Sequence, residues 1–148
     1  MERNLCVNRE ARYNYEVEET YEAGLCLQGT EVKSCRMGRV SLKESYARFV
    51  GEELYLVDAH ISPYPHAAGL NHRPDRPRKL LLHKQQLRRL LGKVSQRGLT
   101  LVPLRMYLKG RWIKLELALA RGRKLFDKRE ELKRRAEERE LRRALKLR

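Results

Sequence analysis

The strongest limit on the fold of this chain comes from short stretches in which apolar and polar residues alternate one by one. Large apolar side chains stand at positions 113, 115, 117 and 119, with Lys114 and Glu116 between them. Tyr13, Tyr15 and Val17 alternate with polar residues in the same way. Successive side chains of a strand point to opposite faces, so this period of two predicts half-buried strands.

Further strand-like segments complete this pattern. The first strand is expected to continue past a bend into residues 23–27, and others lie at 45–50, 54–61 and 99–108. Tight turns are expected at 51–53 and 109–110, so each joins two strands into a hairpin. Four of the five prolines fall between positions 62 and 77 together with Gly69 and Asn71, which predicts a long surface loop there.

Two segments have the period of a helix instead. The longer, over 83–96, has apolar residues at the spacing i, i+3, i+4, i+7 and is expected to end at Gly98. The shorter follows Thr30, a suitable N-cap, and ends at Gly38. Its Lys33 and Arg36 are expected to point outward. The apolar stripe of the longer helix consists of Leu87, Leu90, Leu91 and Val94.

So many short strands in one small domain favour a closed barrel over a sandwich. The predicted fold class is mostly β: a small antiparallel oligonucleotide-binding-type (OB) barrel with two or three helices and a basic C-terminal tail. The chain has 148 residues, 41% hydrophobic and 36% charged, which suffices for one modest core. We therefore predict one domain over 1–120 and a tail over 121–148.

The tail is the most strongly charged segment. It holds 13 Lys or Arg against 6 Asp or Glu, with no Pro and one Gly. Glu130, Glu131 and Glu138 each precede an Arg by four residues, which stabilises a helix by about 0.2–0.5 kcal/mol per pair. That is too little to order a helix whose apolar stripe is broken. We predict a tail that is disordered alone and folds on a partner; the alternative is a solvated charged segment without a special role.

Positive charge also marks the rest of the chain. The net charge is +15, and residues 1–120 hold 21 Lys or Arg against 13 Asp or Glu. Such a field attracts RNA, DNA or an anionic membrane, and the tail lacks the apolar face that membrane insertion needs. Basic clusters that could grip phosphates beside a stacking ring lie at four places. They are Asn8, Arg9, Arg12 and Tyr13; Lys33, Arg36 and Arg39; Arg73, Arg76, Arg78 and Lys79; and the tail.

Catalytic and metal-binding patterns are absent from the sequence. It has no Gly-rich phosphate loop, GxSxG elbow or zinc-ligand spacing, and its four His residues lack the HExxH arrangement. We predict no enzymatic activity, no metal and no cofactor. Cys26 and Cys35 lie in apolar patterns and are expected to be small buried hydrophobes. Three cysteines without CxxC pairing, and a start without an apolar core segment, favour a cytoplasmic protein.

Several strings of residues, in order from Asn8 to the end, carry a family resemblance. They include YEAG, GTEVKS, RKLLL and DKR. The chain resembles the small protein B (SmpB) family, the SsrA-binding proteins of bacterial trans-translation. The resemblance implies an RNA-binding adaptor that binds the tRNA-like domain of transfer-messenger RNA (SsrA) and delivers it to stalled ribosomes. Elongation factor Tu is then an indirect partner, because it binds the same aminoacylated RNA.

The resemblance also implies residue roles. Asn8, Glu22 and Leu81 match family positions tied to RNA binding, to which charge and placement add Arg9, Arg12, Lys33, Arg36 and Lys79. It implies that the tail becomes a helix in the empty mRNA channel beside the small-subunit decoding centre. The tail residues matched to that stretch are Gly122, Phe126, Asp127, Lys128 and Arg129.

Two positions depart from the family pattern, and one other function class stays open. The aromatic ring of Phe126 retains stacking but not hydrogen bonding, and Cys35 replaces a more usual Leu. A non-specific RNA chaperone or ribosome-associated basic protein would need basic charge alone. Selectivity for the tRNA-like domain separates that alternative from the adaptor.

Overall fold

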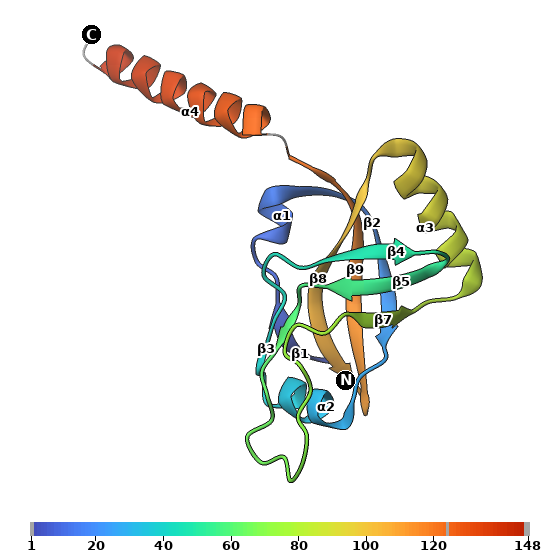
Figure 1. The fold of residues 1–148 in the computed structure, drawn as a ribbon. Coiled ribbons are helices and arrows are strands. Elements are labelled where there is room, and N and C mark those ends of the chain that lie inside the picture. The colour runs from blue at the N-terminus through green and yellow to red at the C-terminus, as the bar shows by residue number, and fades with distance from the viewer. Residues whose placement is uncertain (1, 124, 147–148) are drawn as a thin grey trace.

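The computed structural model describes residues 2–123 and 125–146, with side chains described at all of these positions except 97, 125–132 and 146. Strands dominate, and the helices lie between them and at the C-terminal end (Figure 1). The strands are β1 (Glu2–Val7), β2 (Tyr15–Leu25), β3 (Val40–Ser41), β4 (Tyr46–Val50), β5 (Glu53–Val57), β6 (His60–Ile61), β7 (Arg78–Leu81), β8 (Thr100–Lys109) and β9 (Trp112–Gly122). The helices are α1 (Ala11–Asn14), α2 (Gly29–Arg36), α3 (Lys84–Arg97) and α4 (Leu125–Lys146).

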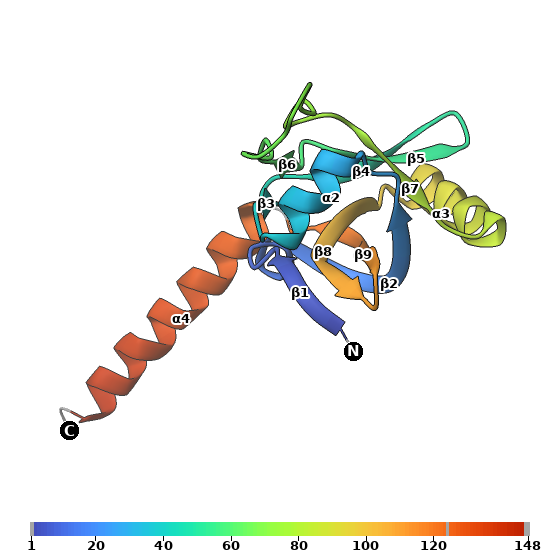
Figure 2. The same ribbon diagram turned by 90° about the horizontal axis from the view of Figure 1, so that it is seen from below.

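The main sheet closes on itself. β8, β4, β5, β7, β2 and β9 pair in that order, and β9 pairs again with β8, all antiparallel. β1 adds to the second half of β8, and Figure 2 shows the curved strands wrapped around a common interior. The predicted mostly β, antiparallel class is confirmed, with three helices within residues 2–123 and a fourth, α4, in the C-terminal segment. The oligonucleotide-binding type is five-stranded, whereas six strands close this ring among residues 2–123, so that type stays a prediction.

The interior of the barrel is filled by aliphatic side chains from every strand of the ring. On β9, Leu115, Leu117 and Leu119 are fully buried, as the period of two predicted. Pro103 lies inside β8 where the register with β9 shifts, a position at which a residue without an N–H group is tolerated. The core is completed by Ala23, Leu54, Leu56, Leu80, Leu90, Leu101 and Met106.

Both predicted hairpins and the long helix are present. Gly51, between β4 and β5, has φ +65°, and Gly110, between β8 and β9, has φ +61°. α3 ends at Gly98, whose left-handed backbone is the expected C-terminal stop. The predicted strand over 54–61 is interrupted, because the left-handed backbone at Asp58 ends β5, and His60 joins a separate two-stranded sheet of β3 and β6.

Near the N-terminus several predictions were wrong. Tyr13 belongs to α1 and is exposed, so the first predicted strand begins only at Tyr15. From there β2 runs without a break to Leu25, and its irregularity is a register shift between Val17 and Glu19. β1 was not predicted, because it pairs only with β8, far along the chain.

Two details around α2 also differ from prediction. Its N-cap is Gln28, whose side chain and that of Glu31 form a reciprocal capping box. Thr30 lies inside the first turn, so its hydroxyl is free to contact His72. Cys35 is buried as predicted, whereas Cys26 follows the end of β2 and is exposed.

α3 packs Leu90 into the core, and ion pairs fasten the helix to β2. The Glu19 carboxylate accepts hydrogen bonds from Arg89 Nη2 at 2.8 Å, Lys93 Nζ at 2.5 Å and the Tyr21 hydroxyl at 2.5 Å. These donors lower the pKa of Glu19 to about 2. Arg89 and Lys93, two basic groups of α3, are therefore engaged within the fold.

α4 extends away from the barrel (Figure 1). Every side chain described between positions 133 and 145 is exposed, including Leu141 and Leu145. Over residues 133–145, the absence of an apolar face that docks on the barrel agrees with the broken stripe in the sequence. Among the described residues, no helix has the length and apolar content needed to cross a membrane.

Candidate nucleic-acid interface

The register of five strands gathers outward-facing side chains into one surface, which we call the outer strip. Glu2 lies opposite Lys109 and Asn4 opposite Tyr107. Tyr107 in turn lies opposite Lys114, and Lys114 opposite Gly24, so the surface continues from β1 across β8 and β9 to β2. The outer strip consists of Glu2, Asn4, Arg105, Tyr107, Lys109, Trp112, Lys114, Glu116, Glu22, Gly24 and Leu81, of which Tyr107 is buried under its neighbours.

At one end of the outer strip, Glu22 and Leu81 line the same hollow. Its volume is about 300 Å³, and Gly24, His83, Gln86 and Lys114 also line it. Leu81 lies opposite Gly24 in the ladder and is 49% exposed. A Cβ atom at Gly24 would lie 3.3 Å from Leu81 Cβ, so glycine leaves room for the Leu81 side chain over β2. Glu22 and Leu81, from distant parts of the sequence, thus form one site together with Lys114. The site combines an acidic, an apolar and a basic group.

The carboxylate of Glu22 is held by two donors. The Tyr107 hydroxyl donates a hydrogen bond to Oε2, and Lys109 Nζ lies 3.3 Å from the same oxygen. The hydrogen bond from Tyr107, helped by Lys109, holds the pKa of Glu22 below its usual range. Among the residues with described side chains, Oε1 has only Lys109 Nζ at 3.4 Å. This oxygen is therefore available to accept a hydrogen bond from the amino or imino group of an unpaired base.

Tyr107 is itself fixed by Arg105. The guanidinium carbon of Arg105 lies 4.0 Å from the centroid of the Tyr107 ring. Arg105 also donates from Nε to Glu116 at 2.7 Å, from Nη1 to Asn4 at 2.8 Å and from Nη2 to Glu2 at 3.1 Å. Three strands thus hold the ring whose hydroxyl positions Glu22.

Under the predicted role of Glu22 in RNA binding, replacement of Tyr107 by Phe is expected to weaken that binding about three- to tenfold, because the ring stays while the donor to Glu22 is lost. The pKa of Glu22 should rise toward its ordinary value, which NMR titration of the side chain can follow. Tyr55→Phe is the matched control, since it removes a hydroxyl that donates to Glu53 at 2.7 Å outside the outer strip. Equal losses of affinity in both variants would contradict the role given to Tyr107.

The N-terminal cluster has two kinds of residue. Asn8 acts within the fold: its side-chain amide donates to the carbonyl oxygen of Pro103 at 3.0 Å, and its main-chain N–H donates to that of Leu104 at 2.8 Å. Arg9 and Arg12 are exposed and have no ion-pair partner among the described side chains. Asn8 therefore positions the turn that presents the two arginines.

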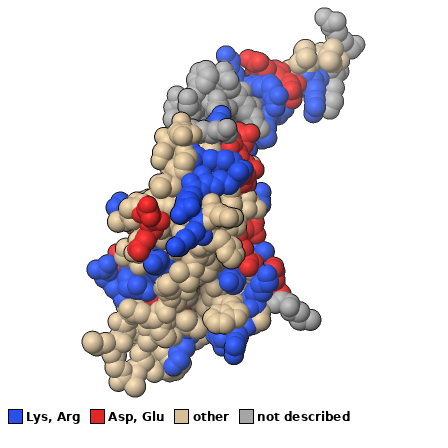
Figure 3. All heavy atoms as spheres, turned by 90° about the vertical axis from the view of Figure 1, so that its right-hand side faces the viewer, with Lys and Arg blue, Asp and Glu red and all other residues tan. Residues whose placement is uncertain are grey.

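The predicted basic residues around α2 and β7 are spread over more than one surface. Lys33 Nζ lies 5.3 Å from the centroid of the Tyr64 ring. Arg36 Nη2 donates to the carbonyl oxygen of Arg111 at 3.4 Å, which brings α2 to the turn between β8 and β9. Lys79 Nζ forms an ion pair with Glu53 at 3.2 Å. In Figure 3 basic side chains form several separate groups on the visible face, with acidic ones among them.

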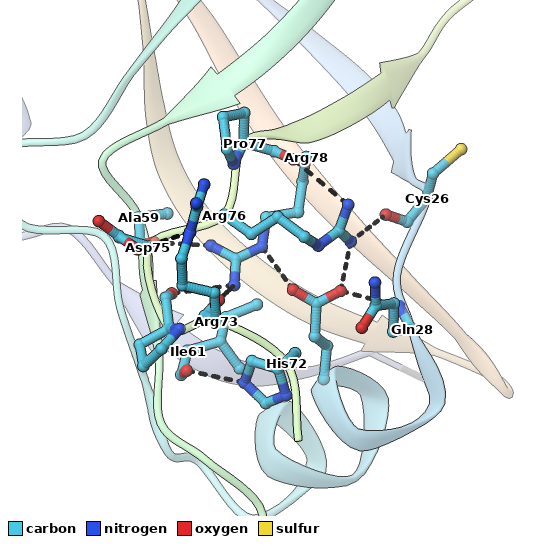
Figure 4. Close-up of polar contacts among 12 residues, drawn as sticks. Cys26, Gln28, Ala59, Ile61, His72, Arg73, Asp75, Arg76, Pro77 and Arg78 are labelled. Atoms are coloured by element: carbon cyan, nitrogen blue, oxygen red, sulfur yellow. Dashed lines mark hydrogen bonds and ion pairs between the residues drawn. The ribbon is translucent and has the colours of Figure 1, made fainter. Parts of the chain in front are cut away.

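Arg78, predicted as part of a phosphate-gripping cluster, is instead fully buried. Its Nε lies 2.6 Å from Glu31 Oε2, and Arg76 Nη2 lies 2.5 Å from Glu31 Oε1 (Figure 4). Arg78 also donates to the carbonyl oxygens of Ala59 at 2.7 Å and Pro74 at 2.9 Å. The prediction failed because its partner, Glu31, lies on α2, far away in sequence.

This buried network fastens the loop over 62–77 to α2. His72 joins it through contacts of 2.8 Å from its ring nitrogens to the Thr30 hydroxyl and the Ile61 carbonyl oxygen. Burial alone would raise the pKa of Glu31, but hydrogen bonds from Arg76, the Gln28 N–H and Arg78 outweigh it and lower that pKa. Glu31 is thus a buried carboxylate that two arginines neutralise.

The root of the tail is part of the barrel. Gly122 lies opposite Tyr15 in the ladder, and the Arg123 N–H donates to the Asn14 carbonyl oxygen at 2.8 Å. The ladder of β9 therefore continues past position 120, and Arg123 lies beside α1. The side chains of Phe126, Asp127, Lys128 and Arg129, predicted to act in the tail, lie outside the described ones.

Comparisons with known proteins agree on one family. The family model described as "SmpB protein" matches residues 5–147. The chain is 58% identical to the SsrA-binding protein of Trichodesmium erythraeum over 94% of this chain and 90% of that protein. It is 52% identical to the SsrA-binding protein of Carboxydothermus hydrogenoformans over 100% of this chain and 99% of that protein.

A solved structure supports the same assignment. It is called "tmRNA-SmpB: a journey to the center of the bacterial ribosome", and one of its chains is 57% identical to this one with a TM-score of 0.66. The match covers 80% of this chain and 84% of that chain. With these similarities in sequence and fold, the chain belongs to the SmpB protein family.

Proposed function

We propose that this protein is an RNA-binding adaptor of trans-translation, which binds the tRNA-like domain of transfer-messenger RNA and delivers it to stalled ribosomes. Relatives that are 52–58% identical are named SsrA-binding proteins, and the solved structure concerns SmpB with transfer-messenger RNA on the ribosome. The chain acts in the cytoplasm and catalyses no reaction itself. Elongation factor Tu is an indirect partner through the same aminoacylated RNA.

The observation that carries this proposal is the meeting of Glu22 and Leu81 in one hollow beside Lys114. An exposed leucine supplies an apolar surface for a base or ribose, the carboxylate accepts from a base edge, and the lysine attracts phosphate. Uniform positive charge would bind any RNA, whereas this combination selects a folded one. Arg9, Arg12, Lys33, Arg36 and Lys79 add phosphate contacts on other parts of the domain surface, and Asn8 positions the first two.

The tail has a separate role in the proposal. Over residues 133–145 its exposed side chains give α4 no support from the barrel, so this part of the tail gains a defined position only when it binds. It lies as a helix in the empty mRNA channel, where residues from Gly122 to Arg129 approach the decoding centre and the Phe126 ring stacks on ribosomal RNA. RNA selection in the barrel and ribosome recognition in the tail are therefore separable.

A competition titration tests the adaptor role. Full-length protein and residues 1–123 are titrated against transfer-messenger RNA at near-physiological salt, with an excess of unrelated structured RNA. Selective binding by both forms supports the proposal. Displacement of transfer-messenger RNA by any structured competitor would instead favour a non-specific RNA chaperone, for which charge alone suffices.

Leu81→Ala is expected to weaken selective binding about tenfold, because it removes the apolar surface of the hollow. The thermal midpoint should change little, since Leu81 is already 49% exposed. Val50→Ala is the matched control: Val50 is 53% exposed on β4 and lies outside the hollow. Unchanged affinity of the Leu81 variant, measured in the same titration, would remove the hollow from the interface.

A further inference from the structure

Trp112, the single tryptophan of the chain, stands exposed at the start of β9. It is 63% exposed, although the next residue, Ile113, packs against the core. Trp112 lies opposite Lys109 in the ladder and two positions before Lys114, so its indole is on the outer strip. The ring therefore continues the surface that contains the hollow.

Basic groups surround this indole. The guanidinium carbon of Arg111 lies 5.4 Å from the centroid of the Trp112 ring. Arg36 reaches the same turn through its hydrogen bond to the Arg111 carbonyl oxygen. With Lys109 opposite Trp112, the turn between β8 and β9 presents a flat aromatic surface among three positive side chains.

The acidic residues of this part of the outer strip are already engaged. Glu2, opposite Lys109, forms an ion pair with Arg105 at 3.1 Å. Glu22 accepts from Tyr107 and Lys109. The charge that remains for a partner at the turn is positive. It favours a polyanion over a protein surface with few acidic residues.

We propose that Trp112 stacks on an unpaired base of the bound RNA while Arg36 and Arg111 contact the flanking phosphates. An exposed ring among cations is the arrangement that grips unpaired nucleotides, because every base offers a face for stacking and every nucleotide a phosphate. This inference rests on the proposed function and extends its interface from the hollow along β9 to the turn between β8 and β9. Trp112 thus contacts a nucleotide separate from the one at Glu22.

Intrinsic fluorescence tests the stacking directly, because all tryptophan emission comes from Trp112. Titration of the full-length protein with the isolated tRNA-like domain of transfer-messenger RNA should quench the emission and protect it from acrylamide. Both changes should saturate at the RNA concentration that saturates binding. Emission and acrylamide access that stay constant while the RNA binds would overturn the proposal, as would a change seen only with ribosomal subunits.

Variants give a second readout. Trp112→Ala should weaken binding of the tRNA-like domain about tenfold or more, whereas Trp112→Phe should retain most of the affinity. Leu70→Ala is the control, since Leu70 is a large exposed side chain in the loop over 62–77. Wild-type affinity in Trp112→Ala together with weak binding in Glu22→Gln would refute stacking and leave the adaptor role intact. Absence of selective binding by the wild-type chain would refute the adaptor role itself.

Discussion

Replacement of Glu31 by Gln is expected to lower the free energy of unfolding by about 3–5 kcal/mol, the cost of leaving a buried charge without its partner. Arg78 is fully buried, and Glu31 is the only carboxylate within ion-pair distance of it among the described side chains. Gln keeps the size of the side chain but not its charge. For a domain of this size the thermal midpoint should fall by about 6–20 °C.

Thermal and urea unfolding measure this effect, and the same loop supplies a control. Asp75 pairs with Arg73 at 3.3 Å, with both side chains 71% exposed. Asp75→Asn should therefore cost about 1 kcal/mol or less. Arg78→Met should also destabilise less in the Glu31→Gln background than in the wild type, because the two charges act as a pair. Similar decreases in the free energy of unfolding in Glu31→Gln and Asp75→Asn would show that the buried pair stabilises the fold no more than the exposed pair.

The stability of the protein at acid pH should depend on the same carboxylate, that of Glu31. The pKa of Glu31 is lowered in the folded state, so the folded protein binds fewer protons there than the unfolded chain. The resulting stability is fully present above the unfolded pKa, about 4.3, and is lost as pH falls through the lower folded value. Unfolding free energies measured below about pH 4.5 should therefore fall less steeply in Glu31→Gln than in the wild type.

Removal of residues 124–148 is expected to abolish peptide tagging on stalled ribosomes while selective RNA binding stays within about threefold of the full-length value. The barrel remains complete, since β9 ends at Gly122 and the Arg123 N–H still reaches Asn14. The removed segment carries 11 Lys or Arg and 6 Asp or Glu, so its loss chiefly weakens non-specific attraction. Tagging in a reconstituted translation reaction and the competition titration measure the two effects separately.

A cut after Ala120 serves as the informative comparison. It removes Arg121 and Gly122, which pair with Glu16 and Tyr15. That shorter form should be less stable than residues 1–123 and can lose RNA affinity through the fold. Loss of selective binding in the form that ends at Arg123 would contradict the division between barrel and tail.

The sequence predicted those elements whose stabilising contacts follow a local rule. Alternation located β9, helical spacing located α3, and turn residues located the hairpin of β4 and β5. Elements that depend on distant partners were missed: β1 needs β8, and the short β3 needs β6. Composition alone did not indicate that a basic residue such as Arg78 would be buried.

The residues of the candidate site likewise fall into those that the sequence identified and those that it did not. Exposed basic residues on α1 and α2 were found from charge, because solvated positive groups need no particular partner to be recognised. Glu22 and Leu81 were found only through the family resemblance, since nothing local distinguishes them from an ordinary strand residue. Tyr107 and Trp112 were not identified at all. Their significance depends on the ladder that places one beside Glu22 and the other opposite Lys109.

The closure of the ring by β9 also has consequences for the order of folding. β2, near the start of the chain, pairs with β9 at its far end, and β1 pairs with β8. Such non-local pairings carry a large loop-closure cost, which places folding in the range of milliseconds to seconds. During synthesis, β1 and the edge of β2 that pairs with β9 remain unpaired until the hairpin of β8 and β9 has been made. A nascent chain that stalls before that hairpin therefore exposes two strand edges to aggregation and proteolysis.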